Sequence, residues 1–304
     1  DPANVRIELT QLGMPPDLQR AWSQAIETPY GMIVVTGPTG SGKTSTLYAS
    51  LNKLDRKTRN IVTVEDPIEY EFQDNVTQVQ VTEKMTFPRV MRAFLRQDPD
   101  VMMVGEMRDP ESLKIGIQAS LTGHLVLTTL HTNNAVETLG RMVDMGGEPY
   151  LIAATVICIL AQRLVRTICP QCKQPYTPTE DEILQLGLSP KEAAEKTFWH
   201  GKGCSACRET GYKGRVGVFE LLMNTRPIKE LVTSNASALA LQRAARKQGM
   251  RTMMEDGLDK ALRGITTPAE VIRAVYSVAD LEMPGTAEEE TDFTEALAEE
   301  MAQE

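Results

Sequence analysis

The residues best placed to do chemistry are 37–44, which read Gly-Pro-Thr-Gly-Ser-Gly-Lys-Thr. Glycines let the backbone wrap a phosphate, so that its N–H groups and the start of a following helix point at the anion. Lys43 can then reach the β- and γ-phosphates, and the Thr44 hydroxyl can ligate Mg²⁺. An apolar run before the segment and a helical pattern after it disfavour the alternative, a glycine-rich surface turn. We therefore predict a site for ATP or a close relative. Its expected residues are Gly37, Thr39, Gly40, Ser41, Gly42, Lys43, Thr44 and Ser45.

Acidic residues follow two later apolar runs, Glu65 and Asp66 in the first case and Glu106 in the second. Such a site needs one carboxylate for the magnesium shell and one to orient the attacking water. Most phosphate-cradle enzymes have Asp at the end of the second strand, where this chain has Gly105, so Glu106 must cover part of that work. Solvated loop acids are the alternative, but both clusters end apolar runs in the expected order.

Two histidines flank a further apolar run, His124 before it and His131 after it. An isolated histidine usually has a structural role. His131, however, is expected at the carboxyl end of a strand, where a γ-phosphate would lie. We therefore predict His131, more than His124, as a residue that senses the nucleotide.

Four cysteines form two Cys-x-x-Cys pairs, Cys169 with Cys172 and Cys204 with Cys207, with 31 residues between the pairs. Four such thiolates match tetrahedral Zn²⁺, which tolerates any loop length between the pairs. Disulfides are the competing interpretation, but no export signal is seen and cytosolic thiols stay reduced. A redox site needs only one pair. We predict structural zinc, because four sulfurs leave no open position. Cys158 is predicted to be a core residue.

The net charge of −9 is unevenly distributed. Ten acidic and no basic residues lie between Asp280 and Glu304, which leaves the rest of the chain at about +1. That body offers no general attraction for nucleic acid. No apolar run reaches the length of about 20 residues that a membrane-spanning helix needs. The longest, Leu151–Ala161, is predicted to be a buried helix.

Apolar runs alternate with helical patterns from Asp17 to Arg166, which predicts an α/β fold: a parallel sheet covered by helices, with ligands at the strands' carboxyl ends. The expected strands are Ile33–Thr36, Ile61–Val64, Val101–Val104 and Leu125–Leu130. The expected helices are Thr44–Leu54, Phe87–Arg96, Pro110–Leu121 and Asn134–Met145.

The remaining chain divides by composition. We expect a strand at Arg215–Leu222, followed by helices at Ile228–Val232, Ala238–Gln248, Met254–Arg263 and Pro268–Val275. The expected units are the end of an interdomain linker (1–16), the nucleotide-binding core (17–168), a tetracysteine zinc subdomain (169–211), a strand and helical part (212–279) and a disordered or lone-helix acidic tail (280–304).

The order of these motifs resembles that in the ATPases that drive type II secretion and type IV pilus extension. The matching segments are 37–44, Thr-Val-Glu-Asp-Pro-Ile-Glu at 63–69, Leu-Arg-Gln-Asp-Pro-Asp at 95–100 with Gly-Glu-Met-Arg-Asp at 105–109, and Gly-His-Leu-Val-Leu-Thr-Thr-Leu-His-Thr at 123–132. Segments 161–166, 214–222, 249–253 and 256–258 also look like the family. The resemblance covers roughly residues 5–278, and the cysteine pairs favour the extension and secretion branch over pilus retraction.

The resemblance implies a RecA-like P-loop NTPase core with a small tetracysteine zinc insert and a helical C-terminal part. Glu106, Glu65 and Asp66 would share magnesium binding and water activation, and His131 would contact the γ-phosphate. The protein would work as a homo-hexamer in the cytoplasm, without membrane insertion, on an inner-membrane platform protein and other cytoplasmic assembly components. The resemblance also implies amino-terminal domains, one of which supplies arginines to the site, and we expect them to be absent from this sequence. We therefore expect slow hydrolysis, because a missing arginine finger can cost about 10³–10⁵ in rate.

Two other functions stay open at this point. A RecA-like motor on nucleic acid predicts a basic stripe and stacking aromatics, whereas aromatic residues make up 5% of this chain. A nucleotide-gated scaffold would bind nucleotide without useful turnover. Replacing Glu106 by Gln would separate the scaffold from the secretion or pilus motor, since the motor would lose hydrolysis while keeping nucleotide and a scaffold would behave unchanged.

Overall fold

The computed structural model describes residues 7–72 and 75–275, so the expected acidic tail 280–304 lies outside the described residues. At its centre is a seven-stranded sheet in the order β3-β2-β4-β5-β1-β6-β9. All neighbours in the sheet are parallel except β6 and β9. The strands are β1 (Gly31–Thr36), β2 (Ile61–Glu65), β3 (Val76–Gln80), β4 (Val101–Val104), β5 (Leu125–Leu130), β6 (Val156–Ile168) and β9 (Tyr212–Met223).

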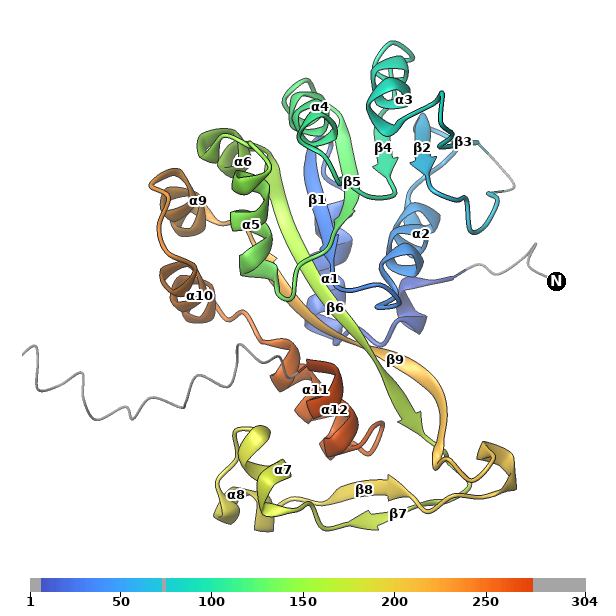
Figure 1. Cartoon of the computed structure of the whole chain (residues 1–304), viewed down its shortest axis with the longest axis vertical. Helices are drawn as coiled ribbons and strands as arrows, with labels where there is room; N and C mark the ends of the chain where they lie inside the picture. The colour runs from blue at the N-terminus through green and yellow to red at the C-terminus, as the bar shows by residue number, and fades with distance from the viewer. Residues whose placement is uncertain (1–6, 73–74, 276–304) are drawn as a thin grey trace, which may run out of the picture.

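Helices cover both faces of the sheet, because the buried strand residues alternate between two apolar clusters. Met32 and Val34 of β1 belong to one cluster, and Ile33 and Val35 to the other. The first cluster is covered by α3 (Phe87–Phe94), α4 (Pro110–Leu121), α5 (Ala135–Asp144), α6 (Pro149–Thr155), α9 (Arg226–Thr233) and α10 (Ala238–Lys247). The second is covered by α1 (Pro16–Ile26) and α2 (Lys43–Lys53). Figure 1 shows the two layers.

The structure confirms the expected α/β class and the four expected strands and four expected helices of the core, with shifts of one or two residues at some ends. The prediction of one buried helix over Leu151–Ala161 is wrong. Helix α6 ends at Thr155, and the chain continues as β6 between β1 and β9. The second half of that run contains Val156, Ile157 and Ile159, whose β-branched side chains favour a strand.

The cysteine-bearing region contains more regular structure than expected. It consists of the pair β7 (Lys173–Tyr176) and β8 (Phe198–Gly201), the short helices α7 (Glu180–Gln185) and α8 (Pro190–Ala194), and a 3₁₀ turn at Ser205–Cys207. A small cluster that includes Leu186, Phe198 and Val271 packs this region against α11 (Met253–Leu262) and α12 (Pro268–Val275). Strands β6 and β9 extend from the core to this unit (Figure 1).

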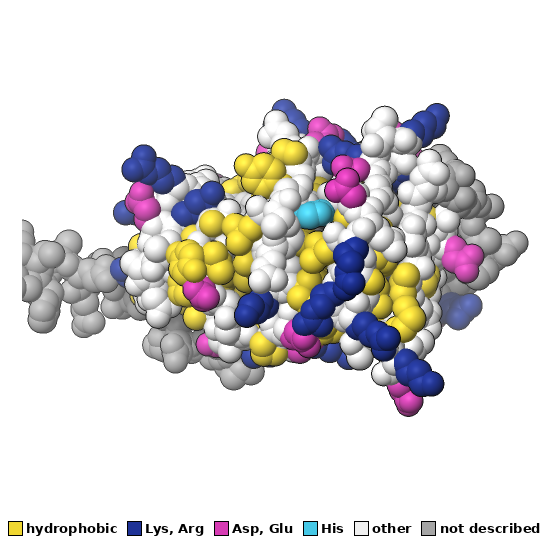
Figure 2. Space-filling model, turned by 90° about the horizontal axis from the view of Figure 1, so that it is seen from above, with side chains coloured by type: hydrophobic (Ala, Val, Ile, Leu, Met, Phe, Trp, Pro, Cys, Tyr) yellow, Lys and Arg dark blue, Asp and Glu magenta, His cyan; other side chains and the backbone are white. Residues whose placement is uncertain are grey.

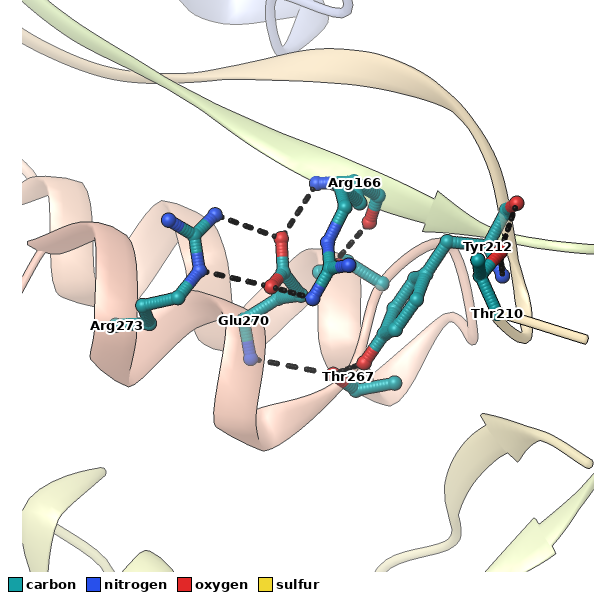
Figure 3. A network of polar contacts seen from close by, with 7 residues as sticks. Arg166, Thr210, Tyr212, Thr267, Glu270 and Arg273 are labelled. Carbon is teal, nitrogen blue, oxygen red and sulfur yellow. Dashed lines mark hydrogen bonds and ion pairs between the residues drawn. The ribbon is translucent and has the colours of Figure 1, made fainter.

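A buried carboxylate, Glu270, ties α12 to β6 near the cysteine unit (Figure 3). The backbone N–H of Arg166 donates to it over 2.9 Å, and the guanidinium groups of Arg166 and Arg273 donate over 2.7–2.9 Å. The Arg166 guanidinium also lies 4.1 Å from the ring centre of Tyr212 on β9. The Tyr212 hydroxyl is 2.9 Å from that of Thr267, at the start of α12. This network fixes the ends of β6 and β9 relative to α12.

The described residues of the expected linker pack against the core. Leu9 and Met14 are buried, and the Leu12 carbonyl accepts a hydrogen bond from Gly217 N–H over 3.2 Å. The opposite end of the molecule from the cysteine unit carries hydrophobic side chains interspersed with basic and acidic ones (Figure 2). Across the described ranges, no helix combines the length and the apolar character that crossing a membrane requires.

Candidate functional site

The loop between β1 and α2 has the backbone of a phosphate cradle. Gly37, Gly40 and Gly42 have φ values of 148°, 77° and 88°, in the region that favours glycine. A Cβ atom on Gly37 would lie 2.4 Å from the carbonyl oxygen of Gln162, so a side chain there would displace the loop. Helix α2 starts directly at Lys43, and its N-terminal N–H groups therefore face the loop. The Ser41 hydroxyl is buried and has no hydrogen-bond partner among the residues that the structure describes, which suits a loop that receives an external anion.

The predicted nucleotide residues and acids meet at one cavity of about 450 Å³. Thr39 to Ser45 line it from the cradle, as do Glu65, Asp66, Glu106 and His131. The remaining predicted residue, Gly37, is not one of the lining residues and stands at the start of the loop, directly after β1. Hydroxyl and carboxylate oxygens are the ligands that Mg²⁺ prefers, and Thr44 supplies the first kind. The donor set therefore fits a magnesium nucleotide.

Glu106 is a buried residue of the cavity lining, just after β4. Its carboxylate forms an ion pair with Arg108, and its Oε2 lies 3.4 Å from Nε2 of His131. The position follows from Gly105, whose N–H donates to the Val64 carbonyl over 2.8 Å and whose carbonyl accepts from the Thr129 hydroxyl over 2.7 Å. Two neighbouring strand ends therefore fix the residue that precedes Glu106.

The cationic groups around Glu106 have shifted pKa values. Burial lowers the pKa of Lys43, and the Glu106 carboxylate opposes this shift. Burial and the charge of Lys43 lower the pKa of His131, again against Glu106. Lys43 Nζ donates to the carbonyl oxygens of Gly37 and Pro38 over 2.8 and 3.1 Å. These shifts favour the neutral imidazole of His131, which can donate one hydrogen bond to a phosphate oxygen.

His131 is positioned by the residue that follows it. The Thr132 N–H donates to the hydroxyl of Thr36 over 2.9 Å, and the two threonine hydroxyls are 2.7 Å apart. Thr36 is the last residue of β1, directly before the cradle, so the histidine loop and the cradle share an anchor. His124 lies at the other end of β5, about 20 Å away along the strand, where its Nδ1 is 3.0 Å from the Ala119 carbonyl.

The acids after β2 differ in exposure. Glu65 is 3% exposed, whereas Asp66 and Glu69 have exposed side chains and line the same cavity. Glu69 was not singled out from the sequence, although it stands in the quoted acidic motif. Glu69 could have been predicted as a site residue because it follows Asp66 by three positions, on a loop that leaves a strand beside the cradle. Arg108 and Arg215 also line the cavity and were likewise missed.

The four predicted cysteines come together in space, and their sulfur atoms all lie within 4.8 Å of one another. The separations Cys169–Cys204 and Cys172–Cys207 are both 3.9 Å, and Cys204–Cys207 is 3.7 Å. Four sulfurs at about 2.3 Å from a tetrahedral zinc ion would be about 3.8 Å apart, whereas a disulfide needs about 2.05 Å. The arrangement therefore fits tetrahedral zinc. Cys158 is fully buried elsewhere, and burial raises the pKa of its thiol to about 12.

Backbone N–H groups donate to two sulfurs of this cluster. The Cys207 sulfur accepts N–H groups of Cys204 and Gly211 at 3.2 Å each, and the Cys172 sulfur accepts that of Gly203 at 3.4 Å. Burial opposes ionisation of Cys207, but these N–H groups and hydrogen bonds with Cys204 and Cys172 lower its pKa to about 7. Burial raises the pKa of Cys172 to about 12, so the proton is held on that sulfur when no metal is bound. Metal binding requires the deprotonated sulfur, so the surroundings of Cys207 suit a ligand.

Known proteins with similar sequences include secretion and pilus-assembly proteins, in agreement with a nucleotide site. The family described as "Type II/IV secretion system protein" matches residues 1–273. Type II secretion system protein E of Aeromonas hydrophila is 49% identical over 90% of this chain and 54% of its own length. The type IV pilus assembly ATPase PilB of Thermus thermophilus is 46% identical over 87% of this chain and 30% of its own length. The chain thus spans about half the length of type II relatives such as the Aeromonas protein.

The fold is also shared with solved structures. The pilus retraction motor PilT, in a crystal structure with bound ADP, has a TM-score of 0.68 and 30% identity, covering 92% of this chain and 70% of PilT. The ATPase DotB of Legionella pneumophila has a TM-score of 0.63 and 24% identity, covering 87% of this chain and 64% of DotB. Sequence, fold and site together show that the chain belongs to the type II/IV secretion system protein family of secretion and pilus-assembly ATPases.

Proposed function

We propose that this chain is the ATPase part of a hexameric motor that powers type II protein secretion or type IV pilus assembly. The observation that carries the proposal is the single cavity in which the cradle, Glu106 and His131 converge. The names of the relatives supply the process, since they include type II secretion and pilus assembly proteins. We further propose a cytoplasmic location and peripheral attachment to the inner membrane through a platform protein.

In this proposal the residues of the cavity have distinct tasks. Residues 37–45 bind the phosphates, with Lys43 at the β- and γ-positions and the Thr44 hydroxyl at Mg²⁺. Glu106 and Asp66 provide carboxylates that hold the magnesium shell and orient the attacking water, and Glu69 joins them as a second exposed acid of that loop. Glu65 supports these acids from its buried position at the end of β2. His131 donates to the γ-phosphate, and its contact with Glu106 reports whether that phosphate is present.

The four cysteines would hold zinc, which supplies a structural crosslink and no open coordination position. We also propose the division into a linker end (1–16), a core (17–168), a zinc subdomain (169–211), a strand and helical part (212–279) and a tail (280–304). The ends of β6 and β9 at Ile168 and Tyr212 support two of these boundaries.

The test is phosphate release from ATP over a wide range of protein concentration, with Lys43→Ala as the blank. Specific activity that rises steeply with concentration is expected, because subunits in a ring complete one another's sites. Activity that is flat in concentration would contradict the ring. Activity equal to the blank, while Lys43→Ala also binds no less ATP than the unaltered chain, would contradict the ATPase assignment.

Two further measurements separate the rival functions. Glu106→Gln is expected to abolish turnover and to keep ATP binding. An unchanged phenotype would instead favour a nucleotide-gated scaffold. Turnover should not respond to DNA, and a several-fold stimulation by DNA would favour a nucleic-acid motor.

A further inference from the structure

The buried acid Glu65 is surrounded by hydrogen-bond donors from three different elements. The Tyr48 hydroxyl on α2 donates to its Oε2 over 2.5 Å. The Thr63 hydroxyl and the Gln78 side-chain amide donate to its Oε1 over 2.6 and 3.1 Å. A carboxylate with both oxygens engaged in this way has little capacity left for a metal ion or a water molecule. Asp66 and Glu69, in contrast, have exposed side chains.

The same donors also hold the backbone that follows Glu65. The Tyr70 carbonyl lies 3.0 Å from both the Tyr48 hydroxyl and the Gln78 amide nitrogen. The Phe72 N–H donates to the Gln78 side-chain oxygen over 2.7 Å. The Tyr48 ring stacks on Phe72 at 4.9 Å and meets Tyr70 edge-on at 5.7 Å. Tyr48 and Gln78 thus bind residues 70 and 72, which follow the exposed acids Asp66 and Glu69 in the chain.

Tyr48 has a particular position on its helix. It stands four residues after Thr44, so the two lie on the same face of α2, one turn apart. Helix α2 therefore starts at the phosphate cradle and, one turn later, reaches the acidic segment through a buried hydroxyl. Burial raises the pKa of Tyr48, and the Glu65 carboxylate adds to the shift, so the hydroxyl keeps the proton that it donates.

We propose that Tyr48, Glu65 and Gln78 form a positioning lock that holds the acidic segment 66–72 in register with the phosphate cradle. Glu65 then acts through its neighbours, and the exposed carboxylates of Asp66 and Glu69 act at the cavity. This assignment rests on the proposed function. It gives Glu65 a positioning role and leaves direct contact with the magnesium shell or the attacking water to Asp66 and Glu69. It also explains why the segment needs a tyrosine in the buried middle of α2, where a phenylalanine would pack equally well.

The first test measures the lock without requiring turnover. Tyr48→Phe keeps the ring and removes the donor, so Glu65 Oε2 loses its partner. Amide hydrogen exchange in residues 66–72 is expected to speed up about tenfold, since an unpaired buried acceptor weakens the local structure. Exchange in residues 37–46 should stay unchanged. Tyr30→Phe, at a tyrosine with an exposed side chain, is the matched control and should change neither region. Unchanged exchange at 66–72 in Tyr48→Phe would overturn the proposal, whether or not the chain hydrolyses ATP.

The second test separates positioning from direct chemistry. Glu65→Gln keeps an acceptor for Tyr48, so it should retain turnover within about threefold, while Glu106→Gln abolishes it. Tyr48→Phe should lower kcat about tenfold and leave the Kd for ATP within twofold. If Glu65→Gln abolishes turnover as completely as Glu106→Gln, with exchange at 66–72 unchanged, Glu65 acts directly on the reacting groups and the lock is rejected. Failure of the proposed function has a different signature: the unaltered chain and Lys43→Ala release phosphate equally slowly and bind ATP equally.

Discussion

Gln162 on strand β6 donates its side-chain amide to the carbonyl oxygen of Ser41 over 2.7 Å, although 121 residues separate the two in the chain. The same side chain accepts a hydrogen bond from the Thr46 hydroxyl, also over 2.7 Å. Ser41 belongs to the cradle and Thr46 to the first turn of α2. Gln162 therefore attaches both parts of the phosphate site to the strand that leads to the cysteine unit.

Replacing Gln162 by Leu is expected to weaken nucleotide binding. The variant keeps the approximate volume but leaves the Ser41 carbonyl and the Thr46 hydroxyl without their partner, which should loosen the cradle and raise the Kd for Mg·ADP about tenfold. Titration calorimetry measures this directly. Gln118→Leu, at an exposed position on α4, is the control and should bind as the unaltered chain does. A Gln162→Leu variant with a Kd within twofold of the original would contradict this role.

Removing metal from the cysteine cluster should lower stability and spare the nucleotide site. Cys172→Ser, or treatment with a strong zinc chelator, is expected to lower the Tm by more than about 5 °C, because binding energy at a structural zinc site is folding energy. The Kd for Mg·ADP should stay within twofold. Cys158→Ala, which removes a cysteine outside the cluster, should remain as sensitive to the chelator as the unaltered chain. If neither Cys172→Ser nor the chelator changes the Tm, no structural metal is bound.

The Glu270 network should make part of the stability depend on pH. Burial would raise the pKa of Glu270, but hydrogen bonds from Arg273 and Arg166 outweigh it and lower the pKa to about 2, against 4.5 for the free side chain. The charged form therefore stabilises the fold fully above about pH 4.5, and this contribution is lost as the pH falls toward 2. Glu270→Gln is expected to cost about 1–3 kcal/mol at pH 7.

This dependence can be measured by thermal unfolding between pH 7 and pH 3. The difference in Tm between the unaltered chain and Glu270→Gln should shrink as the pH drops below 4.5. Glu230→Gln, which removes one partner of an exposed i,i+4 ion pair with Arg226, should cost no more than about 0.5 kcal/mol at any of these pH values. A Glu270→Gln difference that is constant over the whole range would argue against this origin.

A second buried ion pair, between Lys260 and Asp256 on α11, should be sensitive to the loss of its cation. Both side chains are 2% exposed, and the Asp256 carboxylate also accepts the Phe219 N–H over 2.8 Å. Lys260→Met leaves that carboxylate buried without a positive partner, at an expected cost of about 3–5 kcal/mol. Arg263→Met breaks an exposed pair on the same helix and should cost at most about 1 kcal/mol. Urea unfolding compares the two, and equal costs would contradict the prediction.

Much of the core could be predicted because its signals are local. The cradle combines a glycine pattern with a strand before it and a helix after it. The spacing of the two cysteine pairs is in itself typical of a zinc site. The apolar run 151–161 was harder, since its length suits a helix while most of its β-branched residues are concentrated between Thr155 and Ile159. Strand β3, Val76–Gln80, was missed because Thr77, Gln78 and Gln80 make an edge strand polar on both faces.

The parts of the site that sequence reasoning missed depend on long-range pairing. Nothing in the local sequence distinguishes Gln162 from an ordinary polar residue. Its partners, Ser41 and Thr46, lie in the cradle and in α2, more than a hundred residues earlier in the chain. Tyr48 lies inside the expected helix Thr44–Leu54, and nothing in the sequence indicates that β2 and β3 bring Glu65 and Gln78 to its hydroxyl. The acids could be located from sequence, but their division into buried and exposed ones required the packed sheet.

The antiparallel pairing of β6 with β9 carries a cost that the cysteine cluster is placed to reduce. These two strands are joined by residues 169–211, and closing such a connection costs on the order of 3 kcal/mol of chain entropy. Cys169 directly follows β6, and Cys207 stands shortly before β9. A metal ion held by Cys169 and Cys207 would crosslink the connection close to its two ends. Only a few residues would then separate the ion from the end of β6 and from the start of β9. The cluster would then act as a hairpin turn for the longest strand pair of the fold, and assembly of that pair would become faster as well as more stable.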